Sequence, residues 1–267
     1  METKARLKAR NITLGYQDTT VVHDVSIDIG HATVTSIIGA NGCGKSTLLR
    51  GLSKLLTPTT GAVTLDGTDI KNYRQRDFAK LVSMLPQAPV TPSGVTVADL
   101  VARGRHPHQS WLQQWSNTHS TATNQAMEMT GIYNLKDQAV DQLSGGQRQR
   151  VWISMVLAQD TDIILLDEPT TYLDLAHSIE VLDLIRCLNQ CHGKTIVMVL
   201  HDLNLAARYS DKLVLMKTGS ITATGTPTEI LTPAHLDNAY GLDCEIITDP
   251  CADGPLVVPK QSKHQNT

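Results

Sequence analysis

With 267 residues, of which 41% are hydrophobic, the chain is long enough for one large domain or for a core with a subdomain. A formal net charge of −3 argues against a protein built mainly to coat nucleic acid, and we expect no nucleic-acid partner. The polar start lacks the apolar stretch of a secretory signal, and no apolar run approaches the roughly 18 residues that cross a bilayer. We therefore expect any membrane role to come through a partner.

The first elements that the sequence predicts are antiparallel strands. Residues 7–29 alternate between apolar and polar side chains, as strands with one buried face do. Tyr16 falls at the turn between the two predicted strands. Its ring could be a platform for a nucleobase or an ordinary half-buried residue at a strand end, and this segment alone does not decide between them.

The next stretch is a phosphate-binding loop. Residues 33–38 predict a buried strand that runs into it, and a helix is expected from Ser46 onward. The loop fits G-x-x-x-x-G-K-[ST], whose backbone N–H groups wrap nucleotide phosphates. Lys45 would reach the β- and γ-phosphates, and the Ser46 hydroxyl would hold Mg²⁺. The predicted nucleotide-binding residues of the loop are Gly39, Ala40, Asn41, Gly42, Cys43, Gly44, Lys45, Ser46 and Thr47.

A helical region is predicted in the middle of the chain. Residues 81–85 form a second buried strand, and a connection rich in Pro, Ser, Thr and Gly follows at 88–94. From 95 to about 160 the pattern is helical, so we interpret 88–160 as a helical insertion in an α/β core. The core resumes with strands at 162–166 and 195–200, joined by a helix over 175–190.

Polar residues follow both of these later strands. Asp167 and Glu168 come directly after the apolar run 163–166, and ligands gather at the carboxyl ends of strands in open α/β sheets. Asp167 is placed to bind Mg²⁺, and Glu168 to orient or deprotonate an attacking water. His201 ends the strand at 195–200, so we expect its side chain at the same edge of the sheet.

A second anion-binding site is predicted where the stretch 143–147 opens a helix. A serine followed by two glycines places a hydroxyl and backbone amides at a helix N-terminus. The residues of this stretch are Leu143, Ser144, Gly145, Gly146 and Gln147. One mononucleotide does not need two such sites.

These motifs resemble, in order and spacing, those of the ATP-binding cassette ATPases over about residues 5–243. The resemblance also includes Gln87 and the segment Tyr172-Leu173-Asp174, although Tyr172 stands where many members of the family have Ser, Asn or Ala. It implies an α/β fold in which a P-loop (RecA-like) core carries an antiparallel β subdomain and an inserted helical subdomain. The implied ATPase domain covers 1–243, with core segments 1–87 and 161–243 and the helical subdomain at 88–160. Residues 244–267 would form a C-terminal hairpin and a polar tail.

The resemblance also implies roles for single residues. Tyr16 would stack on adenine, Gln87 would sense Mg²⁺ and the attacking water, and Glu168 would be the catalytic base. Asp174 would communicate across a head-to-tail homodimer. In that dimer, residues 143–147 of one subunit close over ATP held by residues 39–47 of the other. The implied catalytic set is Glu168, His201, Gln87 and Lys45, and the implied Mg²⁺ ligands are Ser46, Gln87 and Asp167.

Further resemblances narrow the transported cargo. The stretch 101–108, the tryptophans Trp111 and Trp115, and the ending 240–259 resemble the ATPases of iron–siderophore importers. This implies a peripheral subunit at the cytoplasmic face of the cell (inner) membrane, an integral-membrane permease and an extracytoplasmic substrate-binding protein. Cobalamin, haem and zinc remain alternative cargoes. We do not favour a metal site at His106-Pro107-His108, because the proline fixes the two imidazoles poorly for chelation.

Two other classes of protein fit the sequence less well. A non-transport cassette ATPase that acts on chromosomes usually carries a long coiled coil or zinc modules between the loop and the second anion site, and neither pattern occurs here. A small-molecule kinase or GTPase would leave residues 143–147 unexplained. The five cysteines are odd in number and scattered, which favours reduced thiols in a reducing compartment. Cys187 and Cys191, four apart, could share a metal, but ordinary thiols fit their isolated spacing better.

Overall fold

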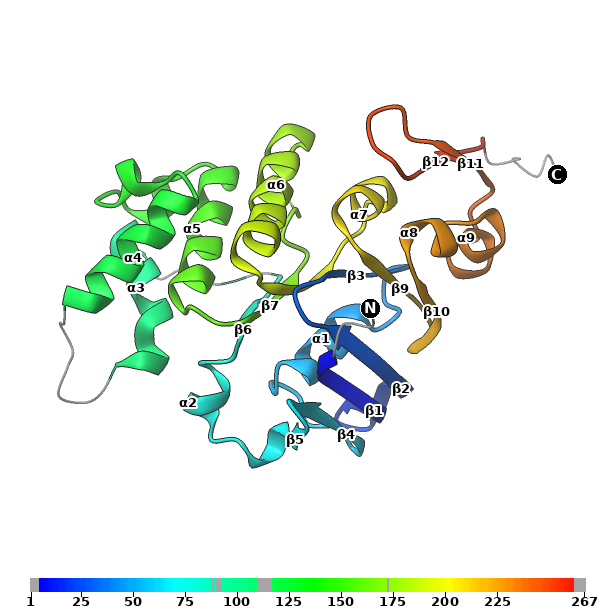
Figure 1. Cartoon of the computed structure of the whole chain (residues 1–267), viewed down its shortest axis with the longest axis horizontal. Coiled ribbons are helices and arrows are strands. Elements are labelled where there is room, and N and C mark those ends of the chain that lie inside the picture. Colours follow the sequence, from blue (N-terminus) through cyan, green and yellow to red (C-terminus); the bar gives the residue numbers. More distant parts are fainter. Residues whose placement is uncertain (1–4, 88, 90–92, 110–116, 172, 262–267) are drawn as a thin grey trace. The chain divides into compact units, whose positions relative to one another are not determined.

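The computed structural model describes residues 5–87, 89, 93–109, 117–171 and 173–261, and these form two compact units (Figure 1). The first unit comprises residues 1–70 and 197–267, and the second comprises 71–196. The expected helical insertion at 88–160 lies within the second unit, and its bounds stay a prediction. The expectations that concern Trp111, Trp115, Tyr172 and the tail after 261 lie outside the described residues.

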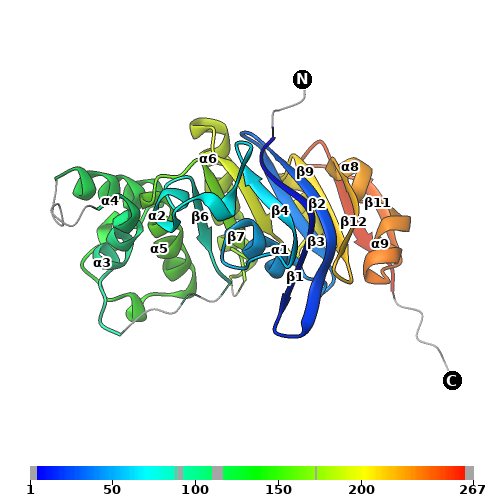
Figure 2. The same cartoon turned by 90° about the horizontal axis from the view of Figure 1, so that it is seen from below.

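The first unit contains an antiparallel sheet with the strand order β2-β1-β4-β5. Its strands are β1 (Ala5–Tyr16), β2 (Thr19–Gly30), β4 (Thr60–Leu65) and β5 (Thr68–Asp69). The long hairpin β1–β2 is visible in blue in Figure 2. Ile12 pairs with Val25 and Leu14 with Val22, and all four side chains are buried. The alternation in the sequence therefore corresponds to one buried face, as expected.

A second group of strands in this unit leads to the phosphate loop. Strand β3 (Val34–Gly39) is buried along its whole length and runs parallel to β9 (Lys212–Lys217), which pairs with β10 (Ser220–Gly225) as a hairpin. Strand β8 (Thr195–Val199) carries the chain from the second unit back to the first. Just after β8, the N–H of Leu200 donates to the carbonyl of Ile37 (3.4 Å), so both strands end at one edge.

The helices of the first unit are α1 (Lys45–Leu52), α7 (Leu203–Tyr209), α8 (Pro227–Ile230) and α9 (Pro233–Tyr240). A C-terminal hairpin of β11 (Cys244–Thr248) and β12 (Pro255–Pro259) holds α7 in two places. The side-chain amide of Asn204 exchanges two hydrogen bonds with the backbone of Val257. Arg208 donates twice to Asp249 (2.6 and 3.0 Å), and these bonds lower the pKa of the nearly buried Asp249 carboxyl.

The second unit begins with α2 (Gln75–Phe78) and contains two parallel strands, β6 (Val82–Leu85) and β7 (Ile163–Asp167). Leu85 pairs with Leu166, so both strands end at the same edge. The long helix α6 (Leu175–His192) follows β7 and ends at Gly193 in a left-handed conformation, as a helix C-terminus favours.

The helical part of the second unit contains α3 (Val97–Ala102), α4 (Asn117–Met129) and α5 (Gly145–Ala158), which pack on one another. A 3-10 segment, Arg103–His108, links to the end of α5: Arg105 donates to the carbonyl of Ala158 and His108 to that of Gln159, both at 2.8 Å. Basic side chains are favourable at a helix C-terminus because they complement its dipole. The α/β fold class predicted from the sequence is thereby confirmed, with this helical part between β6 and β7.

Candidate functional site

The phosphate loop of the first unit turns sharply between β3 and α1. Gly39, Gly42 and Gly44 all have positive φ angles, of 151°, 77° and 102°. A methyl group on Gly39 would lie 2.3 Å from the carbonyl oxygen of Met216 and 2.7 Å from Cys43 Sγ, so no larger residue fits there. Cys43 is buried in the loop, and this burial raises the pKa of its thiol.

The N-terminus of α1 is open to an anion. No side chain among the described residues caps this helix, and its first turn has no acidic residue. Lys45 is buried, with 5% of the residue exposed. Its ammonium group donates to the carbonyls of Gly39 (2.8 Å) and Ala40 (3.1 Å), so it lies over the loop. Backbone amides at a helix N-terminus together with a lysine are the groups that cradle nucleotide phosphates.

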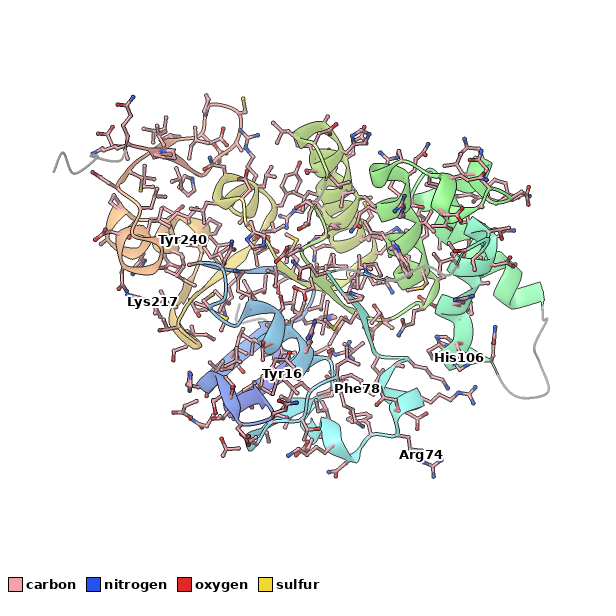
Figure 3. The ribbon with its side chains drawn as sticks, turned by 180° about the vertical axis from the view of Figure 1, so that it is seen from behind. Tyr16, Arg74, Phe78, His106, Lys217 and Tyr240 are labelled. Carbon is pink, nitrogen blue, oxygen red and sulfur yellow. The ribbon has the colours of Figure 1, made fainter. Side chains whose placement is uncertain are left out.

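Two further predicted residues belong to the same unit as the loop. Tyr16, labelled in Figure 3, ends β1 and is 41% exposed. Its hydroxyl accepts a hydrogen bond from Arg50 at 3.0 Å. His201 is exposed and directly follows the segment by which Leu200 pairs with β3, so it stands at the edge where the loop begins. Both residues are accessible to a ligand.

The acidic pair lies in the second unit, at the carboxyl end of β7. Asp167 is the last residue of β7 and is 1% exposed. Glu168 adopts a left-handed backbone with φ 55°, which an L-residue takes only at a cost of about 1–2 kcal/mol. Its Oε2 accepts hydrogen bonds from Gln87 Nε2 (2.6 Å) and from the Thr171 hydroxyl (2.8 Å). The carboxylate of Glu168 is therefore held by donors from two separate segments.

The second anion site is also in this unit and is built as a capped helix start. Ser144 caps α5: its hydroxyl accepts from the N–H of Gln147 (3.3 Å), while the Gln147 side chain accepts from the N–H of Ser144 (3.1 Å). Ser144 and Gly145 are exposed, whereas Leu143 and Gly146 are buried. The exposed hydroxyl and the first-turn amides are the groups that an anion would require, and anion binding here stays a prediction.

Asp174 begins α6 with the same kind of cap. One oxygen, Oδ1, accepts from the backbone N–H of His177 (2.9 Å) and from its Nδ1–H (2.8 Å). These two hydrogen bonds, the backbone one first, lower the pKa of the Asp174 carboxyl. The side chain of Asp174 is 66% exposed, so its other oxygen can meet a group from outside the chain.

The predicted site residues are divided between the two units. Residues 39–47, Tyr16 and His201 belong to the first unit, and Gln87, Asp167, Glu168, Asp174 and 143–147 to the second. Sequence reasoning missed two contributors, Thr171 and His177. Thr171 is three residues after Glu168, a spacing at which a side chain can reach back across a turn. Nothing in the sequence indicates that His177 also touches Gly146, thirty-one residues earlier.

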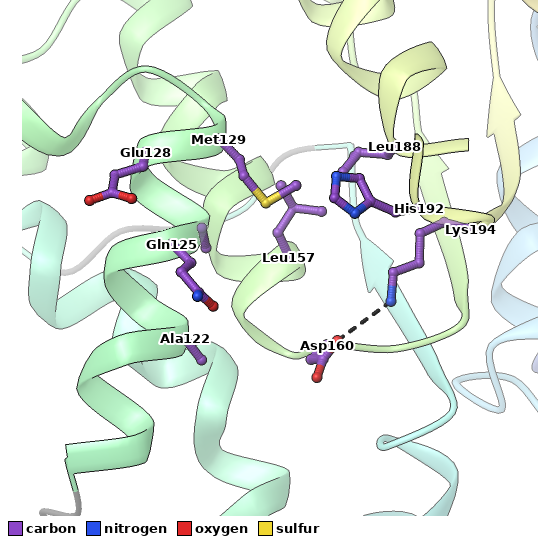
Figure 4. Close-up of a pocket in the computed structure, with 10 residues that line it drawn as sticks. Ala122, Gln125, Glu128, Met129, Leu157, Asp160, Leu188, His192 and Lys194 are labelled. Atoms are coloured by element: carbon purple, nitrogen blue, oxygen red, sulfur yellow. Dashed lines mark hydrogen bonds and ion pairs between the residues drawn. The ribbon is translucent and has the colours of Figure 1, made fainter. Parts of the chain in front are cut away.

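Clusters of metal ligands, free thiols and cavities are other features that could form a site. No group of three or more potential metal-ligating side chains occurs within the described part of the chain. All five cysteines are free, and Cys187 and Cys191 lie with their sulfurs 3.3 Å apart on the exposed face of α6. A cavity of about 520 Å³ lies between α4, the end of α5 and the end of α6 (Figure 4). Asp160 and Lys194 form an ion pair across its floor, and none of the predicted site residues lines it.

Comparisons with known proteins identify the family of the chain. The family model described as ABC transporter matches residues 22–171. The chain is 51% identical to the achromobactin transport ATP-binding protein of Dickeya dadantii (strain 3937), over 95% of this chain and 94% of that protein. It is also 51% identical to the ferric enterobactin transport ATP-binding protein of Escherichia coli (strain K12), over 97% of this chain and 95% of that protein.

Among solved structures, one similar chain is an ATP-binding cassette in a dimeric post-hydrolysis state, bound to ADP and phosphate. It has a TM-score of 0.73 and 26% identity, and the match covers 83% of this chain and 98% of that one. Within the described residues, no helix is both long and apolar enough to cross a membrane. The loop over which Lys45 lies, the Asp167–Glu168 pair and the capped start of α5, together with these matches, show that the chain belongs to the ABC transporter family, as an ATP-hydrolysing cassette subunit.

Proposed function

We propose that this subunit hydrolyses ATP to energise the import of an iron(III)–siderophore complex through a separate integral-membrane permease. One observation carries the choice of cargo: two relatives that match nearly the whole chain at 51% identity are named for achromobactin and ferric enterobactin transport. The subunit would sit at the cytoplasmic face of the cell membrane, bound to the permease. An extracytoplasmic substrate-binding protein would deliver the cargo to that permease.

The nucleotide and Mg²⁺ follow from the donor groups of the chain. The loop amides and Lys45 would bind the phosphates, and the exposed ring of Tyr16 would stack on adenine. Ser46, Asp167 and Gln87 would supply hydroxyl, carboxylate and amide oxygens, the hard donors that Mg²⁺ prefers, so the residues fit this ion. When bound, the ion would neutralise charge that develops on the phosphates.

Within this proposal, Glu168 is the general base. Its carboxylate is fixed at Oε2 by Gln87 and Thr171, and Oε1 would accept a proton from an attacking water. His201 would contact the γ-phosphate from the edge at which the loop begins. Phosphoryl transfer depends mainly on positioning and electrostatic stabilisation, and these side chains supply both.

We further infer that two copies share each ATP. The start of α5 offers an exposed hydroxyl and amides to an anion that a single bound nucleotide does not require. In a head-to-tail homodimer, residues 143–147 of one copy would face the phosphates held by the loop of the other. Asp174 would then contact the second copy through its exposed carboxylate.

A mixing experiment tests the shared site. Ser144→Arg blocks one half of each site and Lys45→Ala weakens the other half, so each homodimer should lose ATP hydrolysis. A mixed dimer contains one intact composite site, so mixing the two inactive variants should restore part of the activity. If mixtures stay as inactive as the separate variants, the sites are not shared between chains.

A second experiment tests the cargo. In the source cell, the Lys45→Ala variant replaces the parent protein, and uptake of radioactive iron is measured with the metal bound to catecholate or hydroxamate siderophores. Cobalamin uptake is measured in parallel. Selective loss of iron uptake is the expected result. Loss of cobalamin uptake alone would point to the alternative cargo, and unchanged uptake of both would refute a role in either import.

A further inference from the structure

His177 makes two contacts that the cap of α6 does not need. The backbone N–H of His177 already completes the cap by donating to Asp174 Oδ1. The imidazole adds a second bond from Nδ1 to the same oxygen (2.8 Å), and since a carboxylate only accepts, Nδ1 carries the proton. Both side chains are about half or more exposed, so this pair contributes little to stability.

The opposite edge of the imidazole lies against Gly146. A methyl group built on Gly146 would stand 2.8 Å from Cδ2 and 3.2 Å from Cγ of His177. Gly146 is buried, and it lies in the first turn of α5, directly between the exposed Gly145 and Gln147. The ring of His177 therefore fills the space over Gly146 that a larger residue would need.

We propose that His177 is a positioning residue that couples Asp174 to the start of α5 within one subunit. The inference rests on the proposed function, in which Asp174 and residues 143–147 both act on the partner copy. A contact that pulls on Asp174 moves the imidazole, and the imidazole moves the Gly146 peptide against which it is packed. Engagement of Asp174 by the second copy thereby sets the position of Ser144 over the ATP that the second copy holds.

Three substitutions separate the two contacts of this imidazole. His177→Asn keeps an N–H donor near the position of Nδ1 but lacks the outer ring atoms, including Nε2, which would lie 3.5 Å from a methyl group on Gly146, so it covers Gly146 less. His177→Phe keeps a flat ring over Gly146 but cannot donate to Asp174. His177→Ala removes both contacts. His192→Ala, at the other end of the same helix, is the matched control because that imidazole is exposed and contacts neither residue.

The measurements are kcat for ATP hydrolysis, binding of a fluorescent ATP analogue, and ATP-dependent dimerisation in the Glu168→Gln background. All three His177 variants should lose kcat, by about fivefold to 150-fold for coupling of typical size. Their dimerisation should require correspondingly more ATP. Binding of the analogue to the monomer should not change, because the loop itself is intact. Asp174→Ala combined with His177→Ala should lose no more activity than the worse single variant.

The outcomes are distinct. If the Asn and Phe variants match the parent in kcat and in dimerisation, the imidazole does not couple the two elements and the inference fails. If kcat stays at the parent value while only the melting temperature falls, His177 has a structural role and the inference also fails. If the parent and the His192 control themselves neither hydrolyse ATP nor dimerise with it, the proposed function fails and the inference fails with it.

Discussion

Replacement of Glu168 by glutamine removes the proposed general base but can keep the hydrogen bonds that hold its side chain. Gln87 and Thr171 both donate to the same oxygen, Oε2, at 2.6 and 2.8 Å. The amide oxygen of a glutamine can take that place and accept both hydrogen bonds, while its NH₂ group occupies the position of Oε1. The substitution therefore keeps the local structure and removes the proton acceptor and its charge.

The expected loss is that of one positioned general base, about 10²–10⁴-fold in kcat, or about 2.7–5.5 kcal/mol in the barrier. Phosphate release under saturating ATP measures this loss, and size-exclusion chromatography with ATP should show that the variant accumulates as a dimer. Glu245→Gln, which removes an exposed carboxylate paired with Lys260 at 3.3 Å, is the control and should leave both readouts unchanged. Hydrolysis by Glu168→Gln at the parent rate would show that Glu168 is not the base.

Three further predictions concern Thr171, Gly39 and His108. Thr171→Val deletes the hydroxyl that donates to Glu168 Oε2, so kcat should fall by about tenfold, the effect of one hydrogen bond to a charged group. Thr171→Ser keeps a hydroxyl and should retain the parent rate. Equal kcat values for the two variants would show that this hydrogen bond does not support catalysis. Gly39→Ala should lower the free energy of unfolding in urea by more than Gly42→Ala does. A methyl group at position 39 would collide with the Met216 carbonyl, whereas one at position 42 would meet no described atom within 4 Å. Gly42→Ala should therefore cost only the strain of an alanine in a left-handed backbone, about 1–2 kcal/mol. Burial lowers the pKa of His108, so the unfolded chain binds its proton first as the pH falls below about 6.5, and the free energy of unfolding should decrease there. His108→Asn should reduce this decrease in the free energy of unfolding between pH 7.5 and 5.5. If the free energy of unfolding depends on pH in the same way in the variant and in the parent, His108 is not the group responsible.

The sequence predicts best where one local pattern determines the structure. The apolar run at 163–166 is a buried strand, and it delivers Asp167 and Glu168 to a strand end as expected. The helix start expected at 143–147 is also present, since Ser144 caps α5, and the structure adds a reciprocal hydrogen bond to Gln147 that the sequence analysis did not predict. Such features depend on residues within a few positions of one another, so a single sequence is enough to find them.

Features that depend on packing between distant segments were not predictable. The left-handed backbone of Glu168 has one local cause, since Pro169 disfavours a right-handed helical residue before it, but that leaves several conformations open. The hydrogen bond from Gln87 to Glu168 requires β6 and β7 to pair in one particular register. The contact of His177 with Gly146 requires a particular approach of α6 to α5, which no periodicity specifies.

The glycines of the two predicted anion sites show that a glycine in a motif can be required for different physical reasons. Gly39 is required by its own chain, because the Met216 carbonyl occupies the place of a side chain. Gly146 is likewise required by the chain, through the ring of His177. Gly42 has a positive φ, and a methyl group there would meet only open space among the described residues. Gly42 is therefore the position at which the absence of a side chain leaves room for a ligand. Substitutions at Gly39 or Gly146 should disturb packing as well as ATP binding, and only those at Gly42 report mainly on the approach of phosphate.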